Sequence, residues 1–320
     1  MVKSPLVSII TPSFNQAAFL EKTIRSVLDQ DYPAIEYMVV DGGSNDGSFQ
    51  IIEKYQNELD WWVSEKDSGQ AEAINKGLLR AKGEYVAWLN SDDYLMPGAV
   101  SEAVRVLMEN PNTSFVFGNV RVVDPSGSVI NTMRYGDWGL PELMSFHIIG
   151  QPAVFMRRSA LEKTGFVDTS FHFLLDHHLW LRLATIGEMK YIPQVWASAH
   201  YHEGCKNLAQ AAEFGKEALR LVEWMRSNPA FAEEFSKHKK QILAGANRLD
   251  GFYLLDAREY GKSFRAYWRS FCLNPSGLNR EWYRMIFAFF APLGLEGLRT
   301  WFIKRRIRKT SGKDFKELRQ

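Results

Sequence analysis

Short apolar runs alternate with segments of helical periodicity along the first hundred residues. The runs at 6–11, 35–40, 61–64 and 85–89 have the length and apolar content of buried strands. The segments between them place apolar residues three or four positions apart, as in 70–81, and this spacing predicts helices. Strands that alternate with helices are typical of a mostly parallel, doubly wound α/β sheet with right-handed crossovers.

A polar segment follows each of these predicted strands. In chain order the segments read TPSFN, DGGSNDGS, EKDSG and NSDD. Ligands of open α/β sheets bind beyond the carboxyl ends of the strands, so we expect the four segments to converge on one binding edge. Loops are polar in most proteins, which explains part of the pattern. It explains less well the carboxylates at or just beyond the strand ends, which are Asp41, Asp67, Asp92 and Asp93.

The segment NSDD sets two carboxylates side by side, at Asp92 and Asp93. Adjacent carboxylates repel each other, and each loses hydration near the end of a strand. One interpretation is a solvated turn, because Asn, Ser and Asp are frequent turn residues. The other is a divalent cation site, in which the charge of the ion offsets the crowding. Taken alone, the segment does not decide between them.

Composition excludes several classes of protein. The chain has 320 residues, is 46% hydrophobic and 24% charged, and carries a net charge of +2, which argues against a general nucleic-acid binder. Cys205 and Cys272 have no metal-ligand spacing and fit a reducing compartment. No signal peptide and no apolar run of about 20 residues is evident, so a cytoplasmic location is expected. P-loop, dinucleotide-binding, G-x-S-x-G and HExxH motifs are also missing.

The pattern changes from about residue 206. Residues 206–278 show helical spacing without strand signals and include a helical hairpin similar to one tetratricopeptide-type unit. Residues 279–320 form a tail that mixes aromatic and basic residues, and 299–320 hold nine Lys or Arg against two acids. Two interpretations stay open for this tail. It is a membrane-associating segment on anionic lipid at the inner face of the plasma membrane, or a helix packed on the catalytic domain before a basic end.

Three stretches of the chain, in order, closely resemble family 2 glycosyltransferases of the GT-A fold. They are VSIITPSFNQAAFLEKTIRSVLDQDYPAIEYMVVDGGSNDGS, SEKDSGQAEAINKGLLRAKGEYVAWLNSDDYLMPGA and GQPAVFMRRSALEKTGFVD. The resemblance implies a GT-A (Rossmann-like), mostly parallel α/β sheet flanked by helices over 1–205, before the helical C-terminal region. It also implies an inverting transfer of sugar from a nucleotide-sugar, with a UDP-sugar favoured, to a hydroxyl of a saccharide or lipid-linked acceptor in polysaccharide or glycolipid biosynthesis.

Position by position, the resemblance implies a set of nucleotide-binding residues. They are Thr11, Pro12, Ser13, Asn15, Asp41, Ser44, Asp46, Asp67, Asn75, Asn90 and Ser91. Asp41 is expected to face the base, where a carboxylate suits the imide N–H of uracil or thymine. The usual family pattern has a second Asp at the position of Gly42, so this chain departs from it there.

The resemblance also implies the chemical roles. Asp92 and His202 would hold Mn²⁺ or Mg²⁺, and Asp93 and Gln151 would contact the sugar or the acceptor. Asp176 matches the general base that takes the proton of the acceptor hydroxyl. The alternative for Asp176 is an acidic residue that stabilises a helix N-terminus.

Five further side chains have more than one interpretation. His177 and His178 lie on a helix surface or in a pocket wall, or they act in catalysis. His202 is a metal ligand or an ordinary loop histidine. Arg157 and Arg158 reach the diphosphate or acceptor, or are surface residues at a helix start. In the family's D-x-D motif the first Asp is replaced here by Asn90, which offers a carbonyl oxygen but no charge.

Two other classes of function remain. A nucleotidyltransferase also uses strand-end carboxylates and a metal, but it usually has a Gly-rich basic loop after the first strand, which TPSFNQAAF lacks. A non-catalytic nucleotide-sugar-binding module would keep the fold. The retention of Asp41, Asp92 and Asp176 argues against it.

Overall fold

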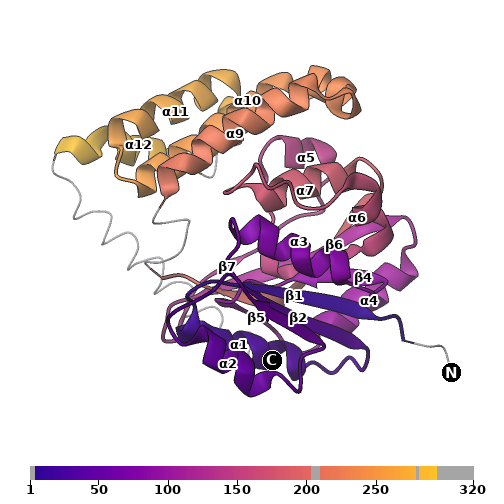
Figure 1. Ribbon diagram of the computed structural model, residues 1–320. Coiled ribbons are helices and arrows are strands. Elements are labelled where there is room, and N and C mark those ends of the chain that lie inside the picture. The colour runs from indigo at the N-terminus through magenta and orange to yellow at the C-terminus, as the bar shows by residue number, and fades with distance from the viewer. Residues whose placement is uncertain (1–3, 203–209, 279–280, 294–320) are drawn as a thin grey trace, which may run out of the picture. The chain divides into compact units, whose positions relative to one another are not determined.

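The computed structural model describes residues 4–202, 210–278 and 281–293 (Figure 1). Two compact units are present. Unit 1 consists of Met1–Gly127, Thr132–Gly139 and Ile149–His200, and unit 2 of Ser128–Asn131, Leu140–Ile148 and Tyr201–Gln320. The predicted limits at 205 and 279 fall outside the described residues, so the three predicted domains stay predictions.

Unit 1 is built on a twisted sheet with helices packed against it (Figure 1). Its strands are β1 (Val7–Ser13), β2 (Ile35–Asp41), β3 (Trp61–Ser64), β4 (Tyr85–Trp88), β5 (Asp93–Leu95), β6 (Thr113–Val123), β8 (Val154–Arg157) and β9 (Glu188–His200), and β7 (Val129–Met133) pairs with β6. Its helices are α1 (Ala17–Leu28), α2 (Ser48–Tyr55), α3 (Gln70–Arg80), α4 (Ala99–Glu109), η1 (Gln151–Ala153), α6 (Arg158–Thr164) and α7 (Leu175–Ala184). The predicted α/β sheet flanked by helices is confirmed.

The sheet has the order β3-β2-β1-β4-β8-β6-β9-β5. Strands β3, β2, β1 and β4 are parallel, as the sequence pattern predicts. Strand β8 runs antiparallel between β4 and β6, and β5 runs antiparallel to β9. The carboxyl ends of β1 to β4 therefore share one edge.

The core of unit 1 lies between this sheet and its helices. Strands β1 and β2 are buried along most of their length, and α1 buries Leu20, Ile24 and Val27 at helical spacing. Each such side chain contributes about 1.5–3 kcal/mol when fully buried. Helix α3 lies very close to β1, because a Cβ atom at Gly77 would be 2.5 Å from the Ile10 side chain.

Helix α7 is mostly buried. Seven of its ten residues are buried, including His177 and His178. The ring of His178 lies 4.3 Å from that of Phe171, and its Nδ1 is 3.9 Å from Oδ2 of Asp168. The helix-surface interpretation of the two histidines is therefore wrong. Because His177 and His178 are polar, the pattern of polar and apolar residues does not show that this helix is buried.

Arg157 and Arg158 lie at the edge of the sheet opposite to Asn90. Because β8 is antiparallel to β4, Arg157 pairs with Tyr85, the first residue of β4. Its guanidinium donates to the carbonyls of Thr113 and Leu107, while that of Arg158 donates to the carbonyl of Gly83. The expectation that either arginine reaches the diphosphate is therefore wrong.

Unit 2 is helical apart from its part of β7. It contains α5 (Leu140–Met144), α9 (Ala211–Ser227), η2 (Pro229–Phe231), α10 (Ala232–Asp256), α11 (Tyr260–Leu273), η3 (Pro275–Leu278), α12 (Trp282–Phe290) and η4 (Ala291–Leu293). Helices α10 and α11 form the predicted helical hairpin. Ser263 and Ser270 of α11 donate to the α10 carbonyls of Gly251 and Ala244, at 2.7 and 2.8 Å.

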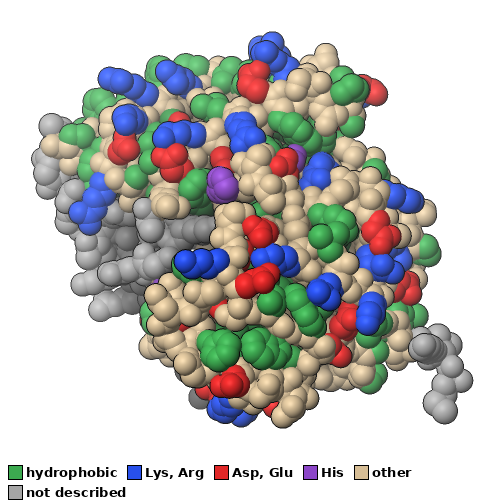
Figure 2. All heavy atoms as spheres, viewed as in Figure 1, with side chains coloured by type: hydrophobic (Ala, Val, Ile, Leu, Met, Phe, Trp, Pro, Cys, Tyr) green, Lys and Arg blue, Asp and Glu red, His purple; other side chains and the backbone are tan. Residues whose placement is uncertain are grey.

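No helix among the described residues is long and apolar enough to cross a membrane. Acidic and basic side chains are interspersed over the face drawn in Figure 2, in agreement with the net charge of +2. Most of the basic tail, at 294–320, lies outside the described residues.

Candidate active site

The polar segments meet at one edge of the sheet, as the strand pattern predicts. In the parallel register Ser13 pairs with Asp41, and Asp41 pairs with Ser64, at the carboxyl ends of β1, β2 and β3. Strand β1 does not stop at Pro12, which is buried and pairs with Val40. Thr11 is also buried, and its hydroxyl lies 3.0 Å from that of Tyr37.

Asp41 is fully buried and closes the loop that follows β2. Its Oδ2 accepts from the backbone N–H groups of Gly43 and Ser44, at 3.1 and 2.9 Å, and from Oγ of Ser64 at 2.6 Å. Its Oδ1 accepts from Oγ of Ser44 at 2.5 Å. Four donors from the chain's own loops therefore bind this carboxylate, which gives it a structural task that the sequence did not reveal.

Asn15 and Asp46 connect the first two strand-end loops. The N–H of Asn15 donates to Oγ of Ser44 at 2.8 Å, and Oδ1 of Asn15 accepts from the N–H of Asn45 at 3.0 Å. Asp46 accepts from the N–H of Ala17 at 2.9 Å. Burial acts to raise the pKa of Asp46, but hydrogen bonds from Ser48 and Ala17 hold it below its usual value. Hydrogen bonds thus join the loop after β1 to the loop after β2.

The carboxylate of Asp67 fills the space beside Gly42. A Cβ atom added to Gly42 would lie 2.9 Å from Oδ2 of Asp67. Asp67 is partly exposed and accepts from the N–H of Gly69 at 2.9 Å. The Asp67 carboxylate therefore lies directly beside Gly42. This proximity cannot be read from the sequence, because it depends on a contact between two loops.

Asn75 binds the segment that precedes α7. Its Nδ2 donates to the carbonyl of Val167 at 2.8 Å, and its Oδ1 accepts from the N–H of Val167 at 3.0 Å. Both ends of the amide are thus engaged with the backbone of one residue, Val167. Asn75 connects α3 to this segment, a role that its sequence position did not indicate.

The segment NSDD forms a fixed turn between β4 and β5. Oγ1 of Thr23, on α1, donates to the carbonyls of Ser91 and Asp93 at 2.9 and 2.6 Å. Nε2 of Gln70 donates to Oδ1 of Asn90 at 2.8 Å. Sequence reasoning missed Thr23 and Gln70, although Gln70 begins the helix after EKDSG.

The two adjacent carboxylates have different surroundings. Asp92 is partly exposed, whereas Asp93 is only 6% exposed. Burial, and then the charge of Asp92, raises the pKa of Asp93 well above its usual value. Nδ1 of His200 lies 2.5 Å from the carbonyl oxygen of Asp92 and therefore carries a proton. This contact fixes the backbone of the turn at Asp92.

Within the described residues, no group of three or more His, Cys, Asp or Glu is arranged to hold a metal ion. His202 lies two residues beyond β9 and belongs to unit 2. Asp92 and Asn90, in unit 1, offer oxygen donors of the kind that Mg²⁺ and Mn²⁺ prefer. A single protein carboxylate is enough where water and substrate phosphates complete the coordination. The predicted pair Asp92 and His202 stays a prediction.

Gln151 and Asp176 are the residues predicted to act on the sugar or the acceptor. Gln151 is 8% exposed, its Nε2 donates to the carbonyl of Trp88 at 2.7 Å, and its Oε1 has no hydrogen-bond partner in the described structure. Asp176 lies in the first turn of α7, and its Oδ1 accepts from the N–H of His177 at 2.7 Å. Burial, with smaller contributions that include the Asp176 charge, raises the pKa of Tyr135.

Tyr135 lies beside the segment that carries Gln151. Its hydroxyl accepts from the N–H of Gly150, the residue before Gln151, at 2.8 Å.

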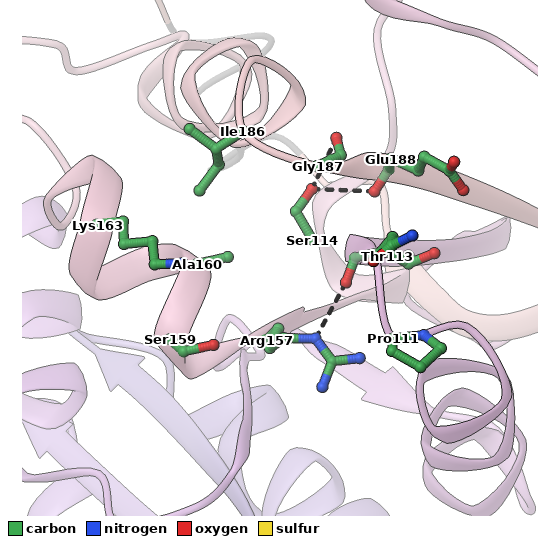
Figure 3. A pocket seen from close by; sticks show the side chains of 11 residues that line it. Pro111, Thr113, Ser114, Arg157, Ser159, Ala160, Lys163, Ile186, Gly187 and Glu188 are labelled. Atoms are coloured by element: carbon green, nitrogen blue, oxygen red, sulfur yellow. Dashed lines mark hydrogen bonds between the residues drawn. The ribbon is translucent and has the colours of Figure 1, made fainter.

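A separate cavity of about 340 Å³ lies near the starts of β6 and β9, at the opposite edge of the sheet (Figure 3). Its lining includes Thr113, Ser114, Arg157, Lys163 and Glu188. Figure 3 shows Arg157 and Ser114 directed at backbone carbonyls, to which they are hydrogen-bonded. Apart from Arg157, none of the residues that the sequence suggested for the site lines it.

Comparison with known proteins defines the class. Residues 8–170 match the model of glycosyl transferase family 2. TuaG, a teichuronic acid biosynthesis glycosyltransferase of Bacillus subtilis, is 33% identical over 194 residues, which cover 58% of this chain and 75% of TuaG. Chondroitin synthase of Pasteurella multocida is 28% identical over 194 residues, which cover 60% of this chain and 20% of the synthase.

Two solved structures share the fold. S. aureus TarS in complex with UDP-GlcNAc has a TM-score of 0.58 at 17% identity and covers 82% of this chain and 89% of that one. A mannosyltransferase from Pyrobaculum calidifontis in complex with GDP-Man and Mn²⁺ has a TM-score of 0.60 at 21% identity and covers 98% and 88%. The fold is that of the GT-A glycosyltransferases. The chain belongs to glycosyl transferase family 2, so it is a glycosyltransferase.

Proposed function

We propose that the protein is an inverting glycosyltransferase that moves a sugar from a UDP-sugar to an acceptor hydroxyl in polysaccharide or glycolipid biosynthesis. The observation that carries the proposal is the gathering of Asp67, Asp92 and Asp93 beyond the carboxyl ends of the first strands, in a chain of this family. Such an edge is where open α/β sheets bind their ligands.

The nucleoside is recognised in this proposal by Asp67. The carboxylate of Asp41 is already bound by four donors of its own loops, so it holds the loop and does not face the base. The Asp67 carboxylate accepts the single imide N–H of uracil. Support for a nucleotide-sugar comes from TarS with UDP-GlcNAc and the mannosyltransferase with GDP-Man. GDP is therefore the alternative nucleotide.

A divalent cation, Mn²⁺ or Mg²⁺, is the proposed cofactor, held by Asp92 with Asn90 as a neutral donor. His202 is the proposed third ligand. When bound, the ion supplies positive charge that stabilises the departing diphosphate. The raised pKa of Asp93 supports this assignment, because a nearby cation would relieve the repulsion between the two carboxylates.

Asp176 acts as the general base in this proposal. It takes the proton of the acceptor hydroxyl while the oxygen attacks the anomeric carbon on the face opposite to the diphosphate, which inverts the configuration. The unpartnered Oε1 of Gln151 accepts a hydrogen bond from a hydroxyl of the bound sugar or acceptor. The names of TuaG and chondroitin synthase support a polysaccharide acceptor. The proposed location is the cytoplasmic side of the membrane where such chains are built.

Thermal shift with a nucleotide panel tests the donor site. UDP, GDP, dTDP and ADP are each added with Mn²⁺ or with EDTA. UDP with Mn²⁺ is expected to stabilise the protein by about 2.7 kcal/mol at a concentration 100 times its Kd, and Asp92→Ala should abolish the effect. If GDP is the one nucleotide that stabilises the protein, the donor is a GDP-sugar and not a UDP-sugar. If no nucleotide stabilises the protein, the proposed donor site is wrong.

The Asp176→Asn variant separates an enzyme from a binding module. It should keep the UDP shift and lose about 10²–10⁴-fold in sugar transfer, the usual contribution of general base catalysis. A wild-type protein that binds UDP-sugars but neither transfers nor hydrolyses them would favour the non-catalytic module.

A further inference from the structure

Unit 2 carries a row of aromatic side chains that joins two helices. Phe264, Trp268 and Phe271 stand four and three positions apart on α11, and their successive ring centroids are 6.3 and 5.8 Å apart. Phe289 of α12 continues the row at 5.1 Å from Phe264, and Phe290 follows at 5.0 Å from Phe289. We call these five residues the aromatic row.

The aromatic row is open to solvent. Trp268 is 50% exposed and Phe289 is 54% exposed. Trp282 and Ile286 are also exposed and extend the stripe along α12, of which only Ala288 is buried. An apolar helix normally buries its stripe against its own chain. An exposed and continuous apolar surface of this kind marks a contact site.

The charges beside the aromatic row are positive. Arg265 and Arg269 are exposed on α11, and neither α11 nor α12 contains an acidic residue. Glu281, just before α12, forms an ion pair with Arg248 at 2.8 Å. Residues 260–320 hold fourteen Lys or Arg against four Asp or Glu. Within the described residues, the surface of α11 and α12 is therefore both apolar and basic.

We propose that the aromatic row and its basic neighbours dock unit 2 on an anionic lipid membrane. Aromatic rings enter the boundary between headgroups and acyl chains, while arginines pair with the headgroup phosphates. A second copy of the chain fits less well, because a two-fold contact through this face would bring the two basic borders together. The proposal does not depend on the proposed reaction, since membrane binding is measured without any sugar donor.

Co-sedimentation of the full-length protein with vesicles tests the proposal. Vesicles of phosphatidylcholine alone are compared with vesicles that also contain phosphatidylglycerol, at low and high salt. We expect binding to the anionic vesicles that weakens about tenfold in high salt. Replacing Trp268 and Phe289 together by Gln should lower the binding about tenfold. Leu219→Gln changes an exposed apolar residue of α9 outside the row and should bind like the wild type.

Each other outcome has a defined meaning. Equal binding of the wild type and the Trp268→Gln, Phe289→Gln variant would overturn the proposal and leave the basic tail as the membrane contact. No binding to anionic vesicles would also overturn it. A dimer in analytical ultracentrifugation that this variant dissociates would assign the face to a second copy. If the variant melts at a lower temperature, Arg265→Gln with Arg269→Gln decides, because it should reduce anionic binding without removing the aromatic row.

Discussion

At the scale of single residues, the molecule uses similar carboxylates for different tasks. Asp41 is buried and bound by loop donors, whereas Asp67 is partly exposed beside Gly42. Asp92 is partly exposed, and its neighbour Asp93 is buried. Burial and hydrogen bonding thus give the neighbouring acidic groups different surroundings, with Asp41 and Asp93 buried and Asp67 and Asp92 partly exposed.

Asp93→Asn should stabilise the ligand-free protein at neutral pH. The folded-state pKa of Asp93 is raised by burial and by Asp92, so the folded protein holds this proton more tightly than the unfolded chain does. Wild-type stability therefore decreases as the pH rises from about 4, the ordinary Asp value, through the folded-state pKa. Urea unfolding in EDTA at pH 4 and pH 7.5 measures the difference between variant and wild type.

The gain should be close to zero at pH 4 and clearly positive at pH 7.5. Asp137→Asn, at an exposed residue of unit 1, is the control and should change little at either pH. A variant that is less stable than the wild type at pH 7.5 would mean that the Asp93 charge is compensated in the ligand-free protein.

At the scale of elements, α1 holds the turn between β4 and β5. Thr23→Val keeps the shape of the side chain but removes the hydroxyl that donates to the carbonyls of Ser91 and Asp93. Because these carbonyls lose a buried donor, we expect a loss of about 1–3 kcal/mol in the free energy of unfolding. The concentration of Mn²⁺ needed for half-maximal activity should also rise, because the turn carries Asp92.

Thr185→Val is the matched control for Thr23→Val. Its hydroxyl donates to the carbonyl of Arg182 at the exposed end of α7, at 2.7 Å. Urea unfolding should show a change below about 0.5 kcal/mol for this surface substitution. An equal loss in both variants would show that the turn depends little on Thr23.

The strands and their converging ends could be predicted because apolar runs and turn residues are local signals. The antiparallel course of β8, which moves Arg157 to the far edge of the sheet, depends on pairing between distant segments. The burial of α7 was missed because His177 and His178 count as polar in a periodicity pattern. Asp67 beside Gly42 and Thr23 beneath the turn at Ser91 are also long-range contacts. The residue types therefore indicated where the site lies. Which of its residues hold the loops together could be seen only from the three-dimensional structure.

At the scale of the whole molecule, the chain divides into two compact units, each with its own internal contacts. In unit 1 the strand-end loops are tied together by Asn15, Ser44 and Asp46. In unit 2 the α10–α11 hairpin is held by Ser263 and Ser270 and by the buried Tyr267. Local opening of each region is set mainly by its own contacts.

Hydrogen exchange should therefore respond to donor binding in unit 1 alone. We expect UDP with Mn²⁺ to slow amide exchange several-fold in the loops that follow β1, β2 and β4. Amides exchange when a loop opens locally, and the ligand binds only while the loop is folded. Amides of α10 and α11 should keep their rates, since their hydrogen bonds lie within unit 2. Mass spectrometry of peptides from both units measures this, and Asp92→Ala with the same ligands is the control. Equal slowing in both units would mean that nucleotide binding is transmitted to the helices, and no slowing in the loops would place the donor site elsewhere.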